Sequence, residues 1–133
     1  MLIAMRKTIS MLLLAVVSAS AMAEWVEVGR GKSDTLYVDV SAIRGTDDKA
    51  KMWALNDYRA PQRPGKRRPF MSEKAQFEYD CKEQQSRLLY FTSHSGNMAG
   101  GEIVDYNIVP GEWTRIAPGS GLEALWKIAC GKV

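Results

Sequence analysis

The residue types that most often carry chemistry are sparse in this chain of 133 residues. His94 is the only histidine, and it follows Ser93, a combination that nucleophilic catalysis uses. Neighbours on a strand point to opposite faces, however, and the sequence indicates no third group that would orient the imidazole. A metal site needs three or four ligands, and there is no cluster of histidines and cysteines. We therefore expect His94 to lie in a surface turn, and we expect no enzyme activity, no metal and no cofactor.

Three further patterns look functional only at first sight. Asp47 with Asp48, and Glu102 with Asp105, lack the facing pair of acids that glycoside hydrolysis needs, so we expect these carboxylates in solvent. The glycine-rich stretch 96–101 lacks the strand–loop–helix context and the lysine of a phosphate-binding loop, so a hairpin turn is expected. Tryptophans are more often core or helix-docking groups than platforms on which a ligand stacks, and we expect this of Trp25, Trp53, Trp113 and Trp126.

One cluster of charge is more informative. Residues 59–70 contain three prolines, one glycine and five basic side chains, and no acidic residue lies between Arg59 and Ser72. Proline supplies no amide to a sheet, so this segment is expected to be an extended hairpin loop whose charges have no local partner. Such a loop either keeps the protein soluble or docks a polyanion, such as a heparan-like glycan, a lipopolysaccharide phosphate or an acidic protein. The candidate binding residues are Arg59, Arg63, Lys66, Arg67 and Arg68.

The N-terminus predicts export. A basic pair, Arg6-Lys7, precedes an apolar run at 9–17 and an A-x-A cleavage site that ends at Ala23, so residues 1–23 are interpreted as a signal peptide. The residue directly after the cleavage site is Glu24 and not a cysteine, so we expect no lipid anchor and a periplasmic, secreted or surface-associated protein. The mature domain, 24–133, has 16 basic and 15 acidic residues, which argues against nucleic-acid binding. It has no second apolar segment long enough to span a membrane.

The chain ends in a short amphipathic helix whose two ends are marked in the sequence. Ser120 can cap the first free amides, Glu123 can bond to the amide of the cap residue itself, and Gly131 suits the left-handed residue after a helix. About three turns of helix do not persist alone in water, so this helix must dock on another layer. The predicted docking residues share one face and are Leu122, Leu125, Trp126 and Ala129.

Before this helix, the patterns are those of short strands with a period of two. Six strands are expected, near residues 25–28, 35–39, 51–58, 72–81, 87–92 and 102–106, with a tight corner at 39–43. In the clearest of them, one face carries Ala75, Phe77, Tyr79 and Cys81. Cys81 and Cys130 are the only cysteines, and two cysteines in an exported chain most simply form one disulfide. We predict an α+β fold: an antiparallel sheet of about six strands with the C-terminal helix packed on one face and tied by this disulfide.

Several motifs, in this order, resemble a known family. In the first half they are Tyr37-Val38-Asp39 with Ser41-x-Ile43, then Met52-Trp53-x-Leu55-x-Asp57-Tyr58. In the second half they are Asp80-Cys81, Gly96-Asn97-Met98-x-Gly100-Gly101, Trp113-x-x-Ile116-x-Pro118-Gly119-Ser120 and Ala129-Cys130. Together they resemble the surface-adhesin protein E family of Gram-negative bacteria. The resemblance implies an antiparallel sheet with a disulfide-tied C-terminal helix. It also implies adhesion to host vitronectin, laminin and plasminogen by a protein that can form a homodimer.

These observations predict an exported, non-enzymatic binding domain. Its partners would be host extracellular-matrix or serum proteins, as the resemblance implies, or other anionic partners of the basic loop. The alternative is a periplasmic protein with a structural or assembly role in the cell envelope, which binds another envelope protein.

Overall fold

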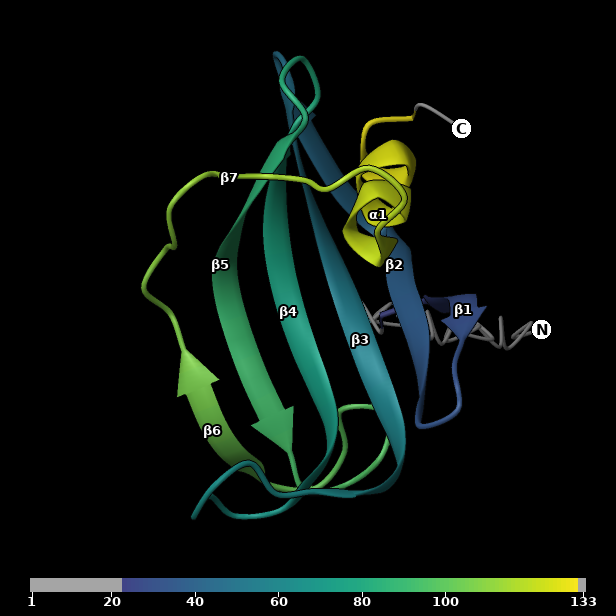
Figure 1. The fold of residues 1–133 in the computed structure, drawn as a ribbon, viewed down its shortest axis with the longest axis vertical. Coiled ribbons are helices and arrows are strands. Elements are labelled where there is room, and N and C mark those ends of the chain that lie inside the picture. Colours follow the sequence, from purple (N-terminus) through teal and green to yellow (C-terminus); the bar gives the residue numbers. More distant parts are fainter. Residues whose placement is uncertain (1–22, 132–133) are drawn as a thin grey trace, which may run out of the picture.

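Six strands that follow one another in the chain pair side by side, and a helix covers part of one face (Figure 1). The computed structural model describes residues 23–131, so the predicted signal peptide lies outside the described residues except for Ala23. The elements are β1 (Trp25–Arg30), β2 (Asp34–Thr46), β3 (Lys49–Gln62), β4 (Phe70–Asp80), β5 (Gln85–His94), β6 (Ile103–Asn107), β7 (Thr114–Arg115) and α1 (Gly121–Ala129). The first six strands form an antiparallel meander in chain order, and β7 pairs with the start of β5. The predicted fold class is confirmed.

β2 continues through the corner that the sequence predicted at 39–43. The register with β3 shifts between Asp39 and Arg44, so the predicted corner is a bulge within one long strand. At this bulge, Oδ1 of Asp39 accepts hydrogen bonds from the amide of Ser41 at 3.0 Å and from its hydroxyl at 2.6 Å. The strand boundary predicted here is wrong, because such local bonds bend a strand without ending it where pairing resumes beyond them.

β3 likewise extends into the segment predicted to be a loop. It runs to Gln62, which pairs with Phe70, so the hairpin loop itself is only residues 63–69. The pairing register with β4 shifts between Asp57 and Gln62. Pro61 lies within this irregular stretch, where the regular ladder is interrupted and its missing amide does not leave a gap in the pairing. The predicted loop boundary at residue 59 is therefore wrong.

The core lies between the sheet and α1. Its fully buried side chains come from β2, β3, β4 and the segment before the helix: Val38, Met52, Tyr79 and Ile116. Phe77 and Cys81 pack against the same cluster, so the apolar face predicted for β4 is present. This face is where the helix docks.

On the other face of the sheet, cationic side chains pair with an acid or lie over aromatic rings. Glu78 is buried, and its Oε1 lies 2.7 Å from Nη2 of Arg87. The guanidinium of Arg87 lies 4.9 Å from the ring centre of Trp113, and Nζ of Lys74 lies 4.8 Å from that of Trp53. Contacts of this kind satisfy a buried carboxylate and hold a cation against an aromatic face.

The four tryptophans therefore do not pack together in one core. All four are half-buried, and only Trp126 packs against the core cluster. The expectation that they are all core or helix-docking groups is wrong for Trp25, Trp53 and Trp113, because the sheet leaves one face without a covering helix among the described residues. On that face an aromatic ring is covered by long cationic side chains instead.

α1 docks through the residues that share its apolar face. Leu125 and Ala129 are buried, and Leu122 and Trp126 are half-buried against the core cluster. At the end of the helix Gly131 has φ 64°, the left-handed conformation that glycine adopts without strain.

The N-terminal cap of α1 differs in one respect from the prediction. Oγ of Ser120 accepts a hydrogen bond from the amide of Glu123 at 3.2 Å, as a cap should. The carboxylate of Glu123, however, accepts from the amide of Gly119 at 3.3 Å and not from that of Ser120. The Ser120 amide already donates to the carbonyl of Ala117, so the predicted reciprocal bond has no free donor.

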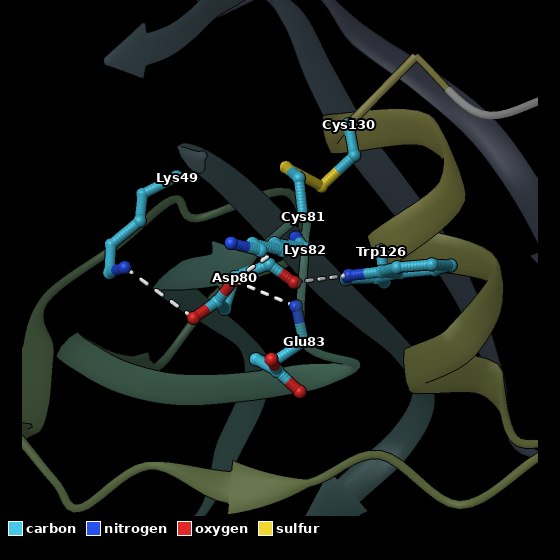
Figure 2. The surroundings of a disulfide bond; sticks show 7 residues. All are labelled: Lys49, Asp80, Cys81, Lys82, Glu83, Trp126 and Cys130. Carbon is cyan, nitrogen blue, oxygen red and sulfur yellow. Dashed lines mark hydrogen bonds and ion pairs between the residues drawn. A yellow bond between two sulfur atoms is a disulfide. The ribbon is translucent and has the colours of Figure 1, made fainter. Parts of the chain in front are cut away.

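The disulfide joins Cys81, directly after β4, to Cys130, the C-cap residue of α1 (Figure 2). The two Cα atoms are 5.6 Å apart. Beside the bridge, Nε1 of Trp126 donates a hydrogen bond of 2.7 Å to the carbonyl oxygen of Asp80. The helix is therefore attached to the end of β4 by one covalent link and one adjacent hydrogen bond.

The turn that receives the helix is itself held by the side chain of Asp80. Its Oδ1 accepts hydrogen bonds from the amides of Glu83 at 3.0 Å and Lys82 at 3.1 Å, and its Oδ2 lies 3.4 Å from Nζ of Lys49. The amide of Glu83 contributes most to lowering the pKa of Asp80. The carboxylate thus stays ionised and holds the turn that contains Cys81.

Candidate functional site

The basic residues predicted as a binding site lie at the end of the sheet away from α1 (Figure 1). Residues 63–69 form the β3–β4 loop, and every one of them is exposed. Arg59 instead lies within β3, where its Nη2 donates to Oγ1 of Thr35 at 3.2 Å. The loop therefore presents four of the five candidates, which are Arg63, Lys66, Arg67 and Arg68.

No charge pairs within the loop, but two of its arginines pair with the region of β6. Nη1 of Arg67 lies 2.8 Å from Oδ2 of Asp105, and Nη2 of Arg68 lies 3.1 Å from Oε2 of Glu102. These side chains are 40–78% exposed, so the two ion pairs contribute little to stability. Across residues 23–131, Arg63 and Lys66 of the same loop form no ion pair.

A hollow of about 390 Å³ lies beside the loop. Half-buried Leu88 and Phe91 of β5 give it an apolar part, and the ion pair between Arg67 and Asp105 gives it a charged part. The complete lining is Arg67, Leu88, Phe91, Asp105, Tyr106 and Asn107. The hollow thus combines apolar surface with charge next to exposed cations, which suits a side chain of a partner protein.

A carboxylate of β4, that of Glu73, lies near Arg67 of the loop. Burial raises the pKa of Glu73, while a hydrogen bond from Tyr58 and the charge of Arg67 act against the rise. Burial and then the charge of Glu73 raise the pKa of Tyr58 to about 12. Arg67 of the loop therefore has a second acidic neighbour, Glu73 of β4, besides Asp105.

The β5–β6 turn contacts the same end of the sheet through residues that sequence reasoning did not select. Met98 and Ala99 have positive φ angles of 55° and 58°, which are uncommon for residues other than glycine. Oδ1 of Asp57 accepts from the amide of Met98 at 2.8 Å, and Oγ of Ser72 accepts from the amide of Ala99 at 2.9 Å. These bonds from β3 and β4 impose the turn conformation, since such backbone geometry persists only where its surroundings require it. The predicted hairpin turn is present.

A second hollow, of about 230 Å³, lies on the face of the sheet opposite α1. Its lining is Ala23, Trp25, Asp39, Ala42, Trp53 and Lys74. The polar groups here are already occupied: Lys74 lies over the ring of Trp53, and the carboxylate of Asp39 is bonded to Ser41. The loop and its neighbouring hollow are therefore the better candidate for a binding site.

Residues 25–131 match the family model of the surface-adhesin protein E family. The chain belongs to this family. Membership gives this family member a role of the surface-adhesin type and leaves its partner unspecified. By its name, the family consists of adhesins and not of enzymes.

The fold of this family member is similar to that of two crystal structures of protein E from Haemophilus influenzae. For crystal form II the TM-score is 0.60 at 11% sequence identity, covering 80% of this chain and 97% of the other. For protein E from non-typeable Haemophilus influenzae the TM-score is 0.57 at 11% identity, covering 83% of this chain and 86% of the other. Identity this low establishes the fold alone. No curated protein sequence matches this one significantly.

Two further properties of the family member concern its described part, residues 23–131. No helix in this range is both long and apolar enough to cross a membrane. The same range contains no group of three His, Cys, Asp or Glu side chains placed to hold a metal ion.

The histidine of this adhesin-family protein does not lie in a turn. His94 is the last residue of β5 and is only 6% exposed, so its predicted surface position is wrong, because β5 continues past Thr92. Its Nε2 lies 2.8 Å from Oγ1 of Thr92, and its Nδ1 is buried without a hydrogen-bond partner among the described residues. Burial, and then the charge of Lys74, lower the pKa of His94 below its usual 6.5.

We expect acid to destabilise the fold through this histidine. In the unfolded chain the imidazole binds a proton near its usual pKa of 6.5, whereas folded His94 stays neutral down to its lowered pKa. Between these two values the unfolded state binds more protons, so the free energy of unfolding falls as the pH drops. Urea unfolding at about pH 7.5 and about pH 5.5 should show this loss, and His94→Gln should lack that part of the pH dependence. Equal pH dependence in the variant and the parent would contradict the assignment.

Proposed function

We propose that this protein is an exported binding protein whose β3–β4 loop binds anionic groups on host extracellular-matrix or serum proteins, or on glycans attached to them. The observation that carries the proposal is the exposed loop with Arg63 and Lys66 unpaired in the described part of the chain, next to a hollow of about 390 Å³. Projecting charges of one sign steer association and are screened by salt over about 8 Å under physiological conditions. Such a site binds by salt-sensitive surface contacts together with insertion of a side chain into the hollow.

Export is part of the same proposal. We infer that the signal peptide is cleaved after Ala23 and that residues 24–133 form the mature domain. The position of β1 supports this, because the first strand of the described residues begins at Trp25, so cleavage after Ala23 would leave the described sheet and helix intact. Mass spectrometry of the exported protein should find Glu24 as the first residue. Fractionation should recover the protein at the cell surface or in the medium, and recovery from the periplasm alone would favour a role within the envelope.

Retention on heparin resin tests the loop. Arg63→Ser combined with Lys66→Ser should elute at a clearly lower salt concentration than the parent, because these are the loop cations without an ion pair in the described chain. Arg67→Ser combined with Arg68→Ser should have a smaller effect, because each of these charges is already partly neutralised by an acid of the β6 region. Both variants should unfold within about 0.5 kcal/mol of the parent, since exposed charges contribute little to the fold.

A matched control removes two positive charges elsewhere. Arg44 and Lys82 are exposed and lie outside the loop, so Arg44→Ser with Lys82→Ser changes the net charge by the same amount. This control should elute close to the parent. If the two loop variants and this control all elute at the same salt concentration, the net charge of the protein decides retention, and the loop is only a solubilising segment.

A further inference from the structure

The outer edge of β6 is open (Figure 1). β6 pairs with β5, and among residues 23–131 it has no second partner strand. An edge strand presents backbone amides and carbonyls that can pair with another chain. β1, at the opposite edge of the sheet, carries a glycine, a register shift and the ion pair between Arg30 and Glu27, which discourage such pairing. In β6 the only charged residue is Asp105.

Large apolar side chains are exposed along this edge and just beyond it. Ile103 is 55% exposed and Tyr106 67%, while Ile108 and Val109, directly after the strand, are 58% and 71% exposed. These are the four most exposed large apolar side chains of the described residues, and they lie within seven consecutive positions. A concentration of exposed apolar surface of this kind marks an interaction site.

The open edge adjoins the hollow beside the basic loop. Tyr106 and Asn107 of β6 form part of its wall, and Leu88 and Phe91 of β5 supply its apolar part. When a peptide adds to a sheet edge, backbone hydrogen bonds supply affinity and pockets for alternate side chains supply specificity. The edge and the hollow together provide both components.

The charges around the edge favour an acidic partner. Arg67 and Arg68 are held near β6 by Asp105 and Glu102, in exposed ion pairs that can be exchanged for a partner's carboxylates at little cost. Together, the four cations of the loop and the two acids of these ion pairs carry a net charge of +2. A basic segment would meet repulsion at the same place.

We propose that β6 accepts an extended, acidic segment of a partner protein as an additional strand. Apolar side chains on alternate positions of that segment contact Tyr106 and enter the hollow, and its carboxylates pair with the arginines of the loop. The inference rests on the proposed function, because it uses the same loop, and it specifies the chemistry of the partner and the mode of binding.

The test uses two synthetic peptides of about ten residues, one alternating valine with glutamate and the other valine with lysine. Each is titrated into isotope-labelled protein purified after export, and backbone amides are followed by NMR. The glutamate peptide should shift the signals of residues 103–107 and slow their amide exchange, with backbone contacts to the peptide in nuclear Overhauser spectra. It should bind at least about tenfold more tightly than the lysine peptide.

Variants of the edge provide the second readout. Tyr106→Ser should weaken binding of the glutamate peptide by about tenfold, because the ring lies at both the edge and the hollow. Val26→Ser, at an exposed valine of the opposite edge strand, is the matched control and should bind like the parent. Ile103→Ser, in β6 but outside the lining of the hollow, should also weaken binding of the glutamate peptide while its retention on heparin stays like that of the parent, so the two proposals fail separately.

Three results would overturn the inference. Shifts confined to residues 63–68 would show that the loop binds carboxylates without strand addition, which leaves the proposed function intact. Equal binding of the two peptides, or no binding, would exclude an acidic segment. Protection of residues 103–107 that depends on protein concentration and occurs without peptide would identify the occupant as a second copy of this chain.

Discussion

Opening the Cys81–Cys130 disulfide should lower the free energy of unfolding by about 4 kcal/mol. The bridge closes a loop with a sequence separation of 49, and the entropy of the unfolded chain rises when that constraint is removed. α1 has nine residues, too few to remain helical alone, so its docking depends on what holds it to β4. The midpoint of thermal unfolding should fall by more than about 10 °C, measured by circular dichroism with and without reductant.

The double variant Cys81→Ala with Cys130→Ala is the control for this measurement. It should unfold at about the temperature of the reduced parent, and reductant should not change it further. The sheet end that carries the basic loop lies away from α1, so the folded variant should keep its retention on heparin (Figure 1). Equal unfolding temperatures for the oxidised and reduced parent, with both thiols shown to be free, would contradict the prediction.

Trp126→Ala should cost about 3 kcal/mol of unfolding free energy. The indole packs against the core cluster, and its Nε1 donates to the carbonyl oxygen of Asp80 at 2.7 Å (Figure 2). Truncation therefore removes apolar contact, leaves a cavity and takes away a hydrogen bond. The side chain is half-buried, which places the cost at the lower end of the range for tryptophan.

Trp126→Phe separates the two contributions. Phenylalanine retains most of the apolar contact but cannot donate to Asp80, so its cost should be about 1 kcal/mol. Chemical unfolding of the parent and both variants measures the difference. A cost for Trp126→Ala no larger than that for Trp126→Phe would show that the ring contributes little packing.

Local signals were sufficient to predict which residues share a face of a strand or of the helix. The alternation that puts Phe77, Tyr79 and Cys81 on one face follows from the period of a strand, and the shared face of α1 follows from the period of a helix. With only two cysteines, the disulfide followed from their number and from the predicted faces. Strand ends were predicted less well, since bulges at Asp39 and before Gln62 carry pairing past residues that normally interrupt a strand.

The sequence by itself determined the sheet with its tied helix and the basic character of the β3–β4 loop, because composition and periodicity are properties of short segments. Only the tertiary structure decided which acids meet that loop, since Asp105 and Glu102 lie 38 and 34 residues from their arginines. It also decided that His94 is buried and that β6 has an open, apolar edge beside a hollow. These features depend on which strands become neighbours and in what register, and strand pairing joins residues whose separation in the chain no local pattern records.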